Sequence, residues 1–179
     1  MRIRYSVAAG AAMVVANAGV ASAAPGDTAV TFSVSGGSLA ISVPAGPVGL
    51  GNGLPGNSIS GQLGNVTVTD TRALLTAAWT ASAISTSFTT GGGTAAETIP
   101  ASSISYWSGT ASATTGLGVF TPGQATAAQA QSLNVSRTAY SLTGGTGNNS
   151  ATWNPTLVVA IPVSAVNGTY TGTVTHSIA

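Results

Sequence analysis

The sequence contains very little charge and no lysine. Only 4% of its 179 residues are charged, and its four basic residues are all arginines. Two of them, Arg2 and Arg4, stand at the very beginning, and the rest of the chain has two arginines against three acidic residues. Nucleic acids and anionic membrane surfaces are bound by clusters of cations, so both are excluded as partners. A surface of Thr, Ser, Asn, Gln and Gly has little charge to prevent self-association.

Cysteine is absent and histidine occurs once. Without disulfides, the hydrophobic core alone must stabilise an exported chain. An enzyme needs an acid, a base, a nucleophile or a metal within reach of one another. Here Asp27, Asp70 and Glu97 are far apart in sequence, His176 is the single histidine, and no serine lies in a Gly-x-Ser-x-Gly turn. Because zinc requires several His or Cys ligands, we expect no enzymatic activity, no metal and no cofactor.

Residues 1–23 have the features of a secretory signal peptide. Two arginines precede a run of small apolar residues over 7–20, and Ala21-Ser22-Ala23 fits the small-x-small cleavage pattern. The alternative, a membrane anchor, is disfavoured because the run is short and contains an asparagine. No later stretch is apolar enough to cross a bilayer. We expect a secreted protein whose residues 24–179 form a single domain.

The most regular pattern lies in residues 154–178. From residue 169 onward, Thr or Ser alternates with a second set of residues, which includes Tyr170, Val174, His176 and Ile178. Such alternation predicts a strand with one buried face and one solvated face. Residues 156–163 are also β-branched and apolar, and Asn167-Gly168 between the two stretches is a strong turn signal. We therefore expect a C-terminal hairpin.

Similar short runs recur along the whole chain, and none has helical periodicity. We expect strands over 29–34, 38–43, 63–72, 74–82 and 84–89 and twice within 133–142, and either a short strand or an irregular crossing over 99–107. The first two are predicted to pair around Gly36-Gly37. Residues 44–64 and 143–149 are expected to be loops, and 109–130 is weakly patterned, with a helical turn as an option over 124–131. Frequent turns between short strands favour a sandwich or a barrel, and we expect an all-β sandwich of Greek-key type.

Two blocks of the sequence resemble the WxL domain, a surface module of Gram-positive bacteria. The first block is VTVTDTR at 66–72, followed by Trp79-Thr80-Ala81. It is similar to the V-x-V-x-D-x-R stretch that leads to the first W-x-L motif of the family. The second block combines NPTL at 154–157, Ile161-Pro162 and GTYTGTVTHSI at 168–178. It is similar to the G-x-Y-x-x-x-L-T-W-x-L ending of the family.

The chain departs from the family pattern at three positions. Ala81 replaces the aliphatic residue of the first motif, His176 replaces the tryptophan of the second, and Ile178 replaces its leucine. The resemblance implies a non-catalytic module that attaches non-covalently to peptidoglycan in the cell wall and acts alongside other surface proteins. A structural or adhesive subunit, which binds other surface proteins through a sheet edge or an apolar patch, is the alternative.

Three residues are candidates for contact with the wall: Trp79, Tyr170 and His176. Each also has a purely structural interpretation. Trp79 is either a core or interface aromatic or a platform for wall sugar or peptide. Tyr170 is expected to pack in the core with a tethered hydroxyl, and His176 to be a packed, hydrogen-bonded residue in place of an aromatic.

Four further residues are expected to be structural parts of the motifs. Asp70 and Arg72 lie two positions apart, which predicts a local ion pair or a turn anchor. Val174 and Ile178 share the apolar face of the last strand and are expected to pack in the core.

Overall fold

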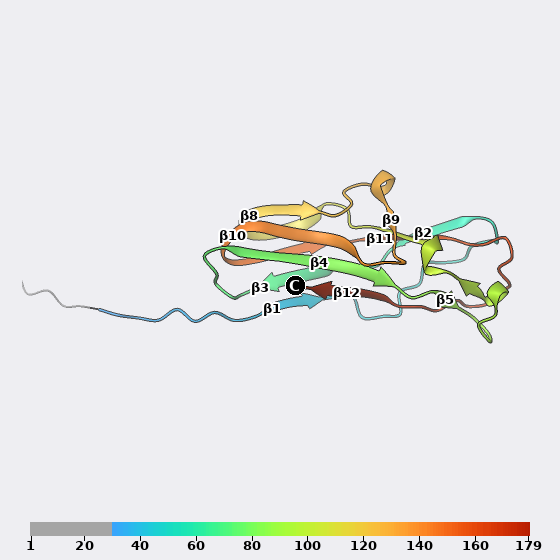
Figure 1. The fold of residues 1–179 in the computed structure, drawn as a ribbon, viewed down its shortest axis with the longest axis horizontal. Helices are drawn as coiled ribbons and strands as arrows, with labels where there is room; N and C mark the ends of the chain where they lie inside the picture. The colour runs from blue at the N-terminus through green and yellow to red at the C-terminus, as the bar shows by residue number, and fades with distance from the viewer. Residues whose placement is uncertain (1–29) are drawn as a thin grey trace, which may run out of the picture. The chain divides into compact units, whose positions relative to one another are not determined.

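The computed structural model describes residues 30–179 (Figure 1). The predicted signal peptide and its cleavage site lie outside the described residues. Residues 34–179 form one compact unit. It consists of strands, loops and three single-turn 3-10 helices, η1 (Ala95–Glu97), η2 (Ala101–Ser103) and η3 (Ala127–Gln129). No helix in the described part of the chain is long and apolar enough to span a membrane.

The larger sheet is antiparallel and has the order β1-β3-β10-β4-β12, with β8 also paired to β10. Its strands are β1 (Leu39–Ser42), β3 (Val66–Asp70), β4 (Ala77–Ser85), β8 (Ala111–Pro122), β10 (Arg137–Trp153) and β12 (Val174–Ile178). The two ends of β10 have different partners: residues 137–145 pair with β4 and residues 149–153 pair with β3. The outer strands β1 and β12 approach each other, so the sheet nearly closes.

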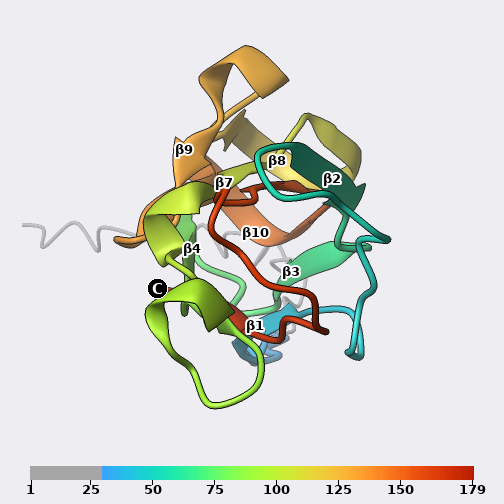
Figure 2. The same cartoon turned by 90° about the vertical axis from the view of Figure 1, so that its right-hand side faces the viewer.

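The second sheet has the order β2-β11-β7-β9, and a two-stranded sheet joins β5 to β6. These strands are β2 (Ser58–Gln62), β5 (Phe88–Thr89), β6 (Thr98–Ile99), β7 (Ile104–Trp107), β9 (Gln131–Ser132) and β11 (Thr156–Ala160). In the end-on view of Figure 2, β2, β7 and β9 lie on one side and β1 on the opposite side. The predicted all-β class is confirmed, and the two antiparallel sheets agree with a sandwich. The Greek-key type stays a prediction.

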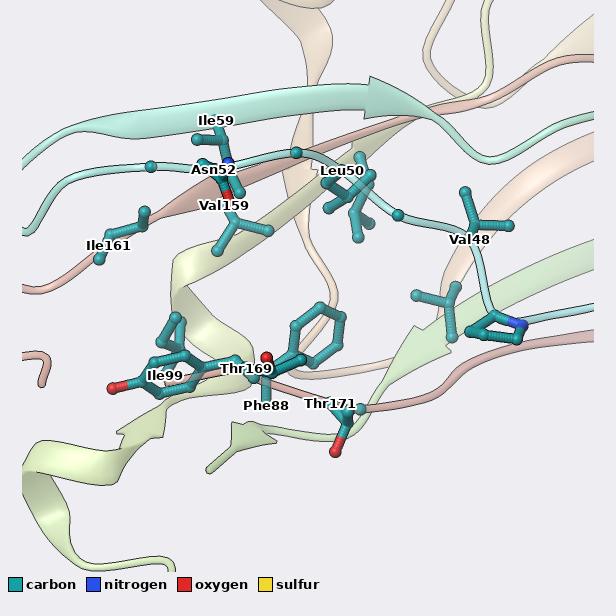
Figure 3. A pocket seen from close by; sticks show the side chains of 18 of the residues that line it. Val48, Leu50, Asn52, Ile59, Phe88, Ile99, Val159, Ile161, Thr169 and Thr171 are labelled. Atoms are coloured by element: carbon teal, nitrogen blue, oxygen red, sulfur yellow. The ribbon is translucent and has the colours of Figure 1, made fainter. Parts of the chain in front are cut away.

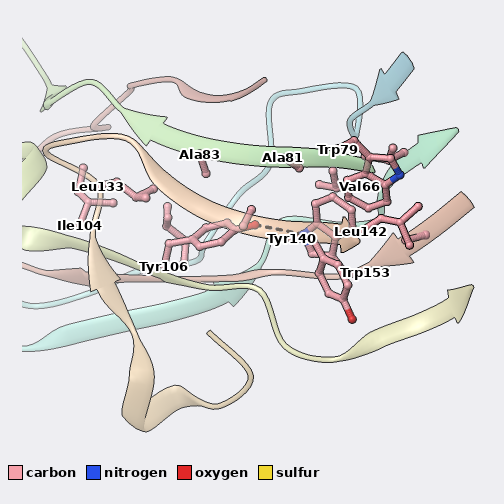
Figure 4. Packing of buried hydrophobic residues seen from close by; sticks show 14 of the residues in the cluster. Val66, Trp79, Ala81, Ala83, Ile104, Tyr106, Leu133, Tyr140, Leu142 and Trp153 are labelled. Atoms are coloured by element: carbon pink, nitrogen blue, oxygen red, sulfur yellow. Dashed lines mark hydrogen bonds between the residues drawn. The ribbon is translucent and has the colours of Figure 1, made fainter. Parts of the chain in front are cut away.

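The core forms where the strand alternation turns apolar side chains inward (Figure 4). Val66 and Val68 of β3 have no exposed surface, and Trp79 of β4 is 3% exposed. Trp153 stacks on Tyr140 with ring centroids 5.0 Å apart. Because β10 contributes both Tyr140 and Trp153 and pairs with three other strands, it organises this part of the core.

The predicted C-terminal hairpin is wrong. Residues 156–160 form β11, which pairs with β2 and β7 in one sheet, whereas β12 pairs with β4 in the other. The Asn167-Gly168 turn signal reflects only the residues at the turn. β11 is buried on both faces over most of its length because it lies between two neighbouring strands. This central position buries more apolar surface than a hairpin with β12 would, so it outweighs the local turn preference.

The expected hairpin around Gly36-Gly37 is also wrong. β1 pairs with β3, and the structure has no strand over residues 30–38. The weakly patterned stretch 109–130 contains β8, and the expected loop 143–149 lies inside β10. The ladder is nonetheless interrupted there by register shifts, and Gly144 and Gly147 adopt positive φ. The helical turn over 124–131 is present as η3.

Candidate functional site

An apolar cleft with a volume of about 1190 Å³ opens between the two layers of the described unit. Ile59 of β2, Val159 of β11 and Ile161 line one side (Figure 3). Phe88 and Ile99 of the small β5–β6 sheet line the other side. Val159 and Ile99 are at most 4% exposed, so these parts of the walls are packed within the protein, and the open space lies beside them. We refer to this opening as the cleft.

The segment 43–55 covers one flank of the cleft. It follows β1 and crosses to the β2 side, where the Gly56 amide donates to the Ile161 carbonyl at 2.9 Å. Gly53 is required for this approach, because a Cβ at its position would overlap the side chains of Ile59 and Ile161. The segment therefore lies against β2 and β11 and leaves the space beside the last strand open.

The opposite rim is formed by residues 165–174, just before and into β12. Thr171 exchanges two backbone hydrogen bonds with Thr89, both 2.9 Å long. Consecutive residues of an antiparallel strand direct their backbone groups to opposite sides, so Gly172 and Tyr170 direct theirs away from Thr89. β12 continues this rim and is hydrogen-bonded to β4 on one side, while β1 approaches its other side. Around Thr171 the rim is thus extended chain with one unpaired side beside an apolar space.

Tyr170 lies in this rim and its ring lines the cleft. Its hydroxyl donates to the Ala96 carbonyl at 3.1 Å or the Val166 carbonyl at 3.0 Å, and it accepts the Val166 amide proton at 3.2 Å. The expected tethered hydroxyl is therefore present. The ring is partly buried and packs against the core, so Tyr170 shapes the cleft wall.

His176 lies at the inner end of the cleft. The Tyr106 hydroxyl accepts the Trp153 indole proton at 3.1 Å and lies 3.2 Å from His176 Nε2. The hydroxyl can therefore donate its own proton to a neutral imidazole. Burial lowers the pKa of His176 to about 4 and raises the pKa of Tyr106. His176 is a packed, hydrogen-bonded and neutral residue near pH 7, as expected for one that replaces an aromatic.

Trp79 lies outside the cleft. It is buried, and its indole nitrogen donates to the Asn149 side-chain oxygen at 2.8 Å. Its ring faces Phe120 with centroids 6.3 Å apart. An indole that is 3% exposed has no face available to a ligand, so the structure corrects the interpretation of Trp79 as a wall-binding platform. The alternative, a core aromatic, is confirmed.

Asp70 and Arg72 form the predicted ion pair. Arg72 donates from two guanidinium nitrogens to the two carboxylate oxygens of Asp70, each at 2.9 Å. Asn149 also donates to Asp70, at 3.3 Å, while it accepts from Trp79. The Arg72 hydrogen bonds hold the pKa of Asp70 below its usual value. The first block of the WxL resemblance is therefore one connected polar cluster with a structural role.

Val174 and Ile178 are partly buried and pack against the core, as expected. Val174 also lines the cleft. Residues 44–64, which supply much of the opposite wall, are predicted to be a loop because they are rich in glycine, proline and asparagine. A signal was present: Val48, Leu50 and Leu54 lie at even spacings among glycines, which is the period of a strand with one apolar face. Val48 and Leu50 both line the cleft.

The ionisable side chains of residues 30–179 are engaged locally. Asp70 is paired with Arg72, Glu97 accepts from the Thr94 amide and hydroxyl, and Arg137 donates to the Ser132 carbonyl. In that part of the chain no group of three or more His, Cys, Asp or Glu side chains is placed to hold a metal ion. Comparison with protein-family models, curated proteins and solved structures found no match to this chain.

Proposed function

We propose that the protein is a secreted, non-catalytic subunit of a cell-surface assembly that binds an extended, apolar peptide segment in the cleft. The observation that carries this proposal is the combination of an unpaired strand edge with an apolar space directly beside it. Peptides bind such edges by adding a strand: their main chain supplies hydrogen bonds, and alternate side chains enter pockets. The cleft offers both parts, since the extended chain at Thr171 is paired with Thr89 on one side and the exposed side chains of Val48 and Leu54 supply apolar surface in the same cleft.

The chemistry of the cleft favours a peptide over a sugar. Its walls are predominantly aliphatic and aromatic, and no charged side chain lines it near pH 7, because His176 is neutral there. Polysaccharides present many hydroxyls, whose burial without hydrogen-bond partners is costly. A peptide with apolar residues at every second position fills such a space and keeps its polar side chains in water.

A binding assay with synthetic peptides tests this function. We expect a fluorescent nine-residue peptide with alternating Val or Phe and Thr to bind with an anisotropy change that saturates. A scrambled peptide of the same composition should bind at least tenfold more weakly. Val48→Asp places a charge on the cleft wall and should abolish binding. Val163→Asp is the matched control, because Val163 is 85% exposed and lies outside the cleft. Equal binding of both peptides, or of both variants, contradicts the proposal.

Attachment to peptidoglycan, which the WxL resemblance implies, is a second candidate. The observation that favours it is Trp107, which alternates with inward Ile104 and Tyr106 on β7 and is itself half-buried. Its indole therefore lies on the outer face of the second sheet, where a sugar or peptide of the wall can stack. We expect wall binding to persist at about 1 M salt, because the chain has so few charges.

Sedimentation with purified cell walls tests this candidate. Trp107→Ala should reduce the bound fraction, whereas Ser105→Ala on the same face should not. Equal sedimentation of the two variants, or release of the protein by salt, contradicts a Trp107 contact.

A further inference from the structure

One segment of the chain has the pattern that the cleft requires. Val30, Phe32 and Val34 alternate with Thr31 and Ser33. The three apolar side chains are 81%, 86% and 77% exposed, and the segment is not part of any strand. A period of two with one fully apolar face is the pattern of a half-buried strand.

The cleft has the complementary features. Its rim at Tyr170, Gly172 and Val174 directs backbone groups away from the neighbouring strand, as the Thr171–Thr89 pairing requires. Its interior presents apolar side chains from both layers within about 1190 Å³. A strand added along this rim would turn every second side chain into that space and the others to solvent. Val30, Phe32 and Val34 are spaced to enter it.

We propose that residues 30–34 of one copy of the protein add as a strand to the cleft of a second copy. This inference rests on the proposed function and names the partner of the same cleft. The low charge of the chain agrees with it, because few like charges would oppose contact between copies.

The own copy and a second copy are the two acceptors to distinguish. The Gly37 amide donates to the Thr71 carbonyl at 2.6 Å, and the Thr71 amide donates to the Ser38 carbonyl at 2.9 Å. These bonds fix the chain at the start of β1, and residues 30–34 precede this point in the sequence. Insertion into the own copy would leave the protein monomeric, whereas donation to a second copy makes its mass depend on concentration. The oligomeric state therefore distinguishes the two acceptors.

The resulting contact is head-to-tail. Each copy offers a donor segment, residues 30–34, and an acceptor cleft that is lined by other residues. A contact between two different surfaces does not close into a dimer by itself and produces rings or open filaments. The protein should therefore form a ladder of oligomers that grows with concentration.

Light scattering after size-exclusion chromatography of the mature chain tests this inference. We expect the wild-type mass to rise with concentration in steps of one subunit. Phe32→Asp should be monomeric at every concentration. Ser33→Asp, which adds the same charge one residue later on the polar face, should associate like the wild type. A wild type that stays monomeric, or equal behaviour of the two variants, overturns the inference.

Mixing two defective variants gives a sharper result. Phe32→Asp keeps an intact cleft, and Val48→Asp keeps an intact donor segment. Each alone should be monomeric, and their mixture should stop at a one-to-one heterodimer. Larger species in the mixture, or no complex, contradict a head-to-tail contact. Circular dichroism and thermal midpoints of each variant close to those of the wild type would show that lost association does not reflect unfolding.

A peptide that covers residues 28–36 separates this inference from the proposed function. It should bind monomeric Phe32→Asp protein and fail to bind Val48→Asp protein. If an unrelated alternating peptide binds and the 28–36 peptide does not, the proposed function stands and the self-association is refuted. If neither peptide binds, both are refuted.

Discussion

The region around Trp153 and the region around the cleft lie in the same two layers, but only the first is filled. Trp153, Tyr140 and Trp79 are at most 3% exposed, whereas the cleft walls enclose about 1190 Å³ of open space. Near Trp153, β10 has partners along both edges; near the cleft, β2 and β12 each pair on one side only. The comparison shows that strand closure, more than apolar content, decides which side chains are buried.

The filled region and the cleft therefore contribute differently to the stability of the fold and to the binding of a partner. Apolar side chains in the closed region are held by neighbours on every side and stabilise the fold. At the cleft, Ile99 and Val159 are at most 4% exposed, but Val48 and Leu54 are 41% and 69% exposed and are available to a partner. Changes in the two regions should therefore have different consequences, which four measurements can check.

The largest effect is expected for Trp153→Ala. The indole is fully buried, stacks on Tyr140 and donates to Tyr106. Its removal should lower the free energy of unfolding by roughly 3–5 kcal/mol, measured by urea denaturation. Val48→Ala in the cleft wall, where Val48 is 41% exposed, should cost less than about 1 kcal/mol. Similar losses for both would remove the distinction between the two regions.

The next largest effect is expected for Asp70→Asn. The substitution removes a buried carboxylate that accepts from Arg72 and Asn149, and should cost about 2–3 kcal/mol. Because the folded pKa of Asp70 is lowered, its contribution is present above pH 3.8 and is lost as the pH falls further. Glu97→Gln is the control, because Glu97 accepts hydrogen bonds within its own turn, from Thr94. It should change the unfolding midpoint far less. An Asp70→Asn protein as stable as the wild type would contradict a structural role for the first sequence block.

A pH titration probes the boundary between the two regions. The pKa of His176 is about 4 in the folded protein and 6.5 when unperturbed. As the pH falls, His176 is therefore protonated in the unfolded chain before it is protonated in the folded protein. Stability is full above pH 6.5 and should decrease by about 2–3 kcal/mol between pH 6.5 and 4. His176→Phe should flatten the stability profile in that window. A slope unchanged in the variant would assign the effect to another group.

The smallest effect is expected at the rim of the cleft. In Gly172→Ala the new Cβ would overlap the ring of Phe88, which should cost about 1–3 kcal/mol and narrow the cleft. Gly92→Ala is the matched control, because its added Cβ would meet only the Glu97 side chain at 3.7 Å and Gly92 does not line the cleft. The two variants should therefore differ both in thermal midpoint and in affinity for an alternating peptide. Equal affinity would show that the rim at Gly172 is not part of the binding surface.

Much of the fold could be predicted from local patterns. The alternation in 63–72 placed Val66 and Val68 on the buried face, and the i, i+2 spacing of Asp70 and Arg72 predicted their ion pair. The pairing of strands was harder to predict. The turn signal at Asn167-Gly168 involves only about four residues, whereas the strands that pair with β11 lie about 50 and about 95 residues earlier in the chain. Trp79 was ambiguous for the same reason. Its burial depends on Asn149 and Phe120, which are distant in sequence.

The sequence by itself determined the all-β class, the absence of cation clusters and the apolar faces of individual strands, because each follows from composition or from a period of two residues. Only the tertiary structure decided which strands pair, that Trp79 is enclosed and that Tyr170 borders an open space. Strand partners are chosen by the total apolar surface that the whole chain buries. No single stretch of sequence contains the cleft, since segments 43–55 and 165–174, β11 and the β5–β6 sheet line it together.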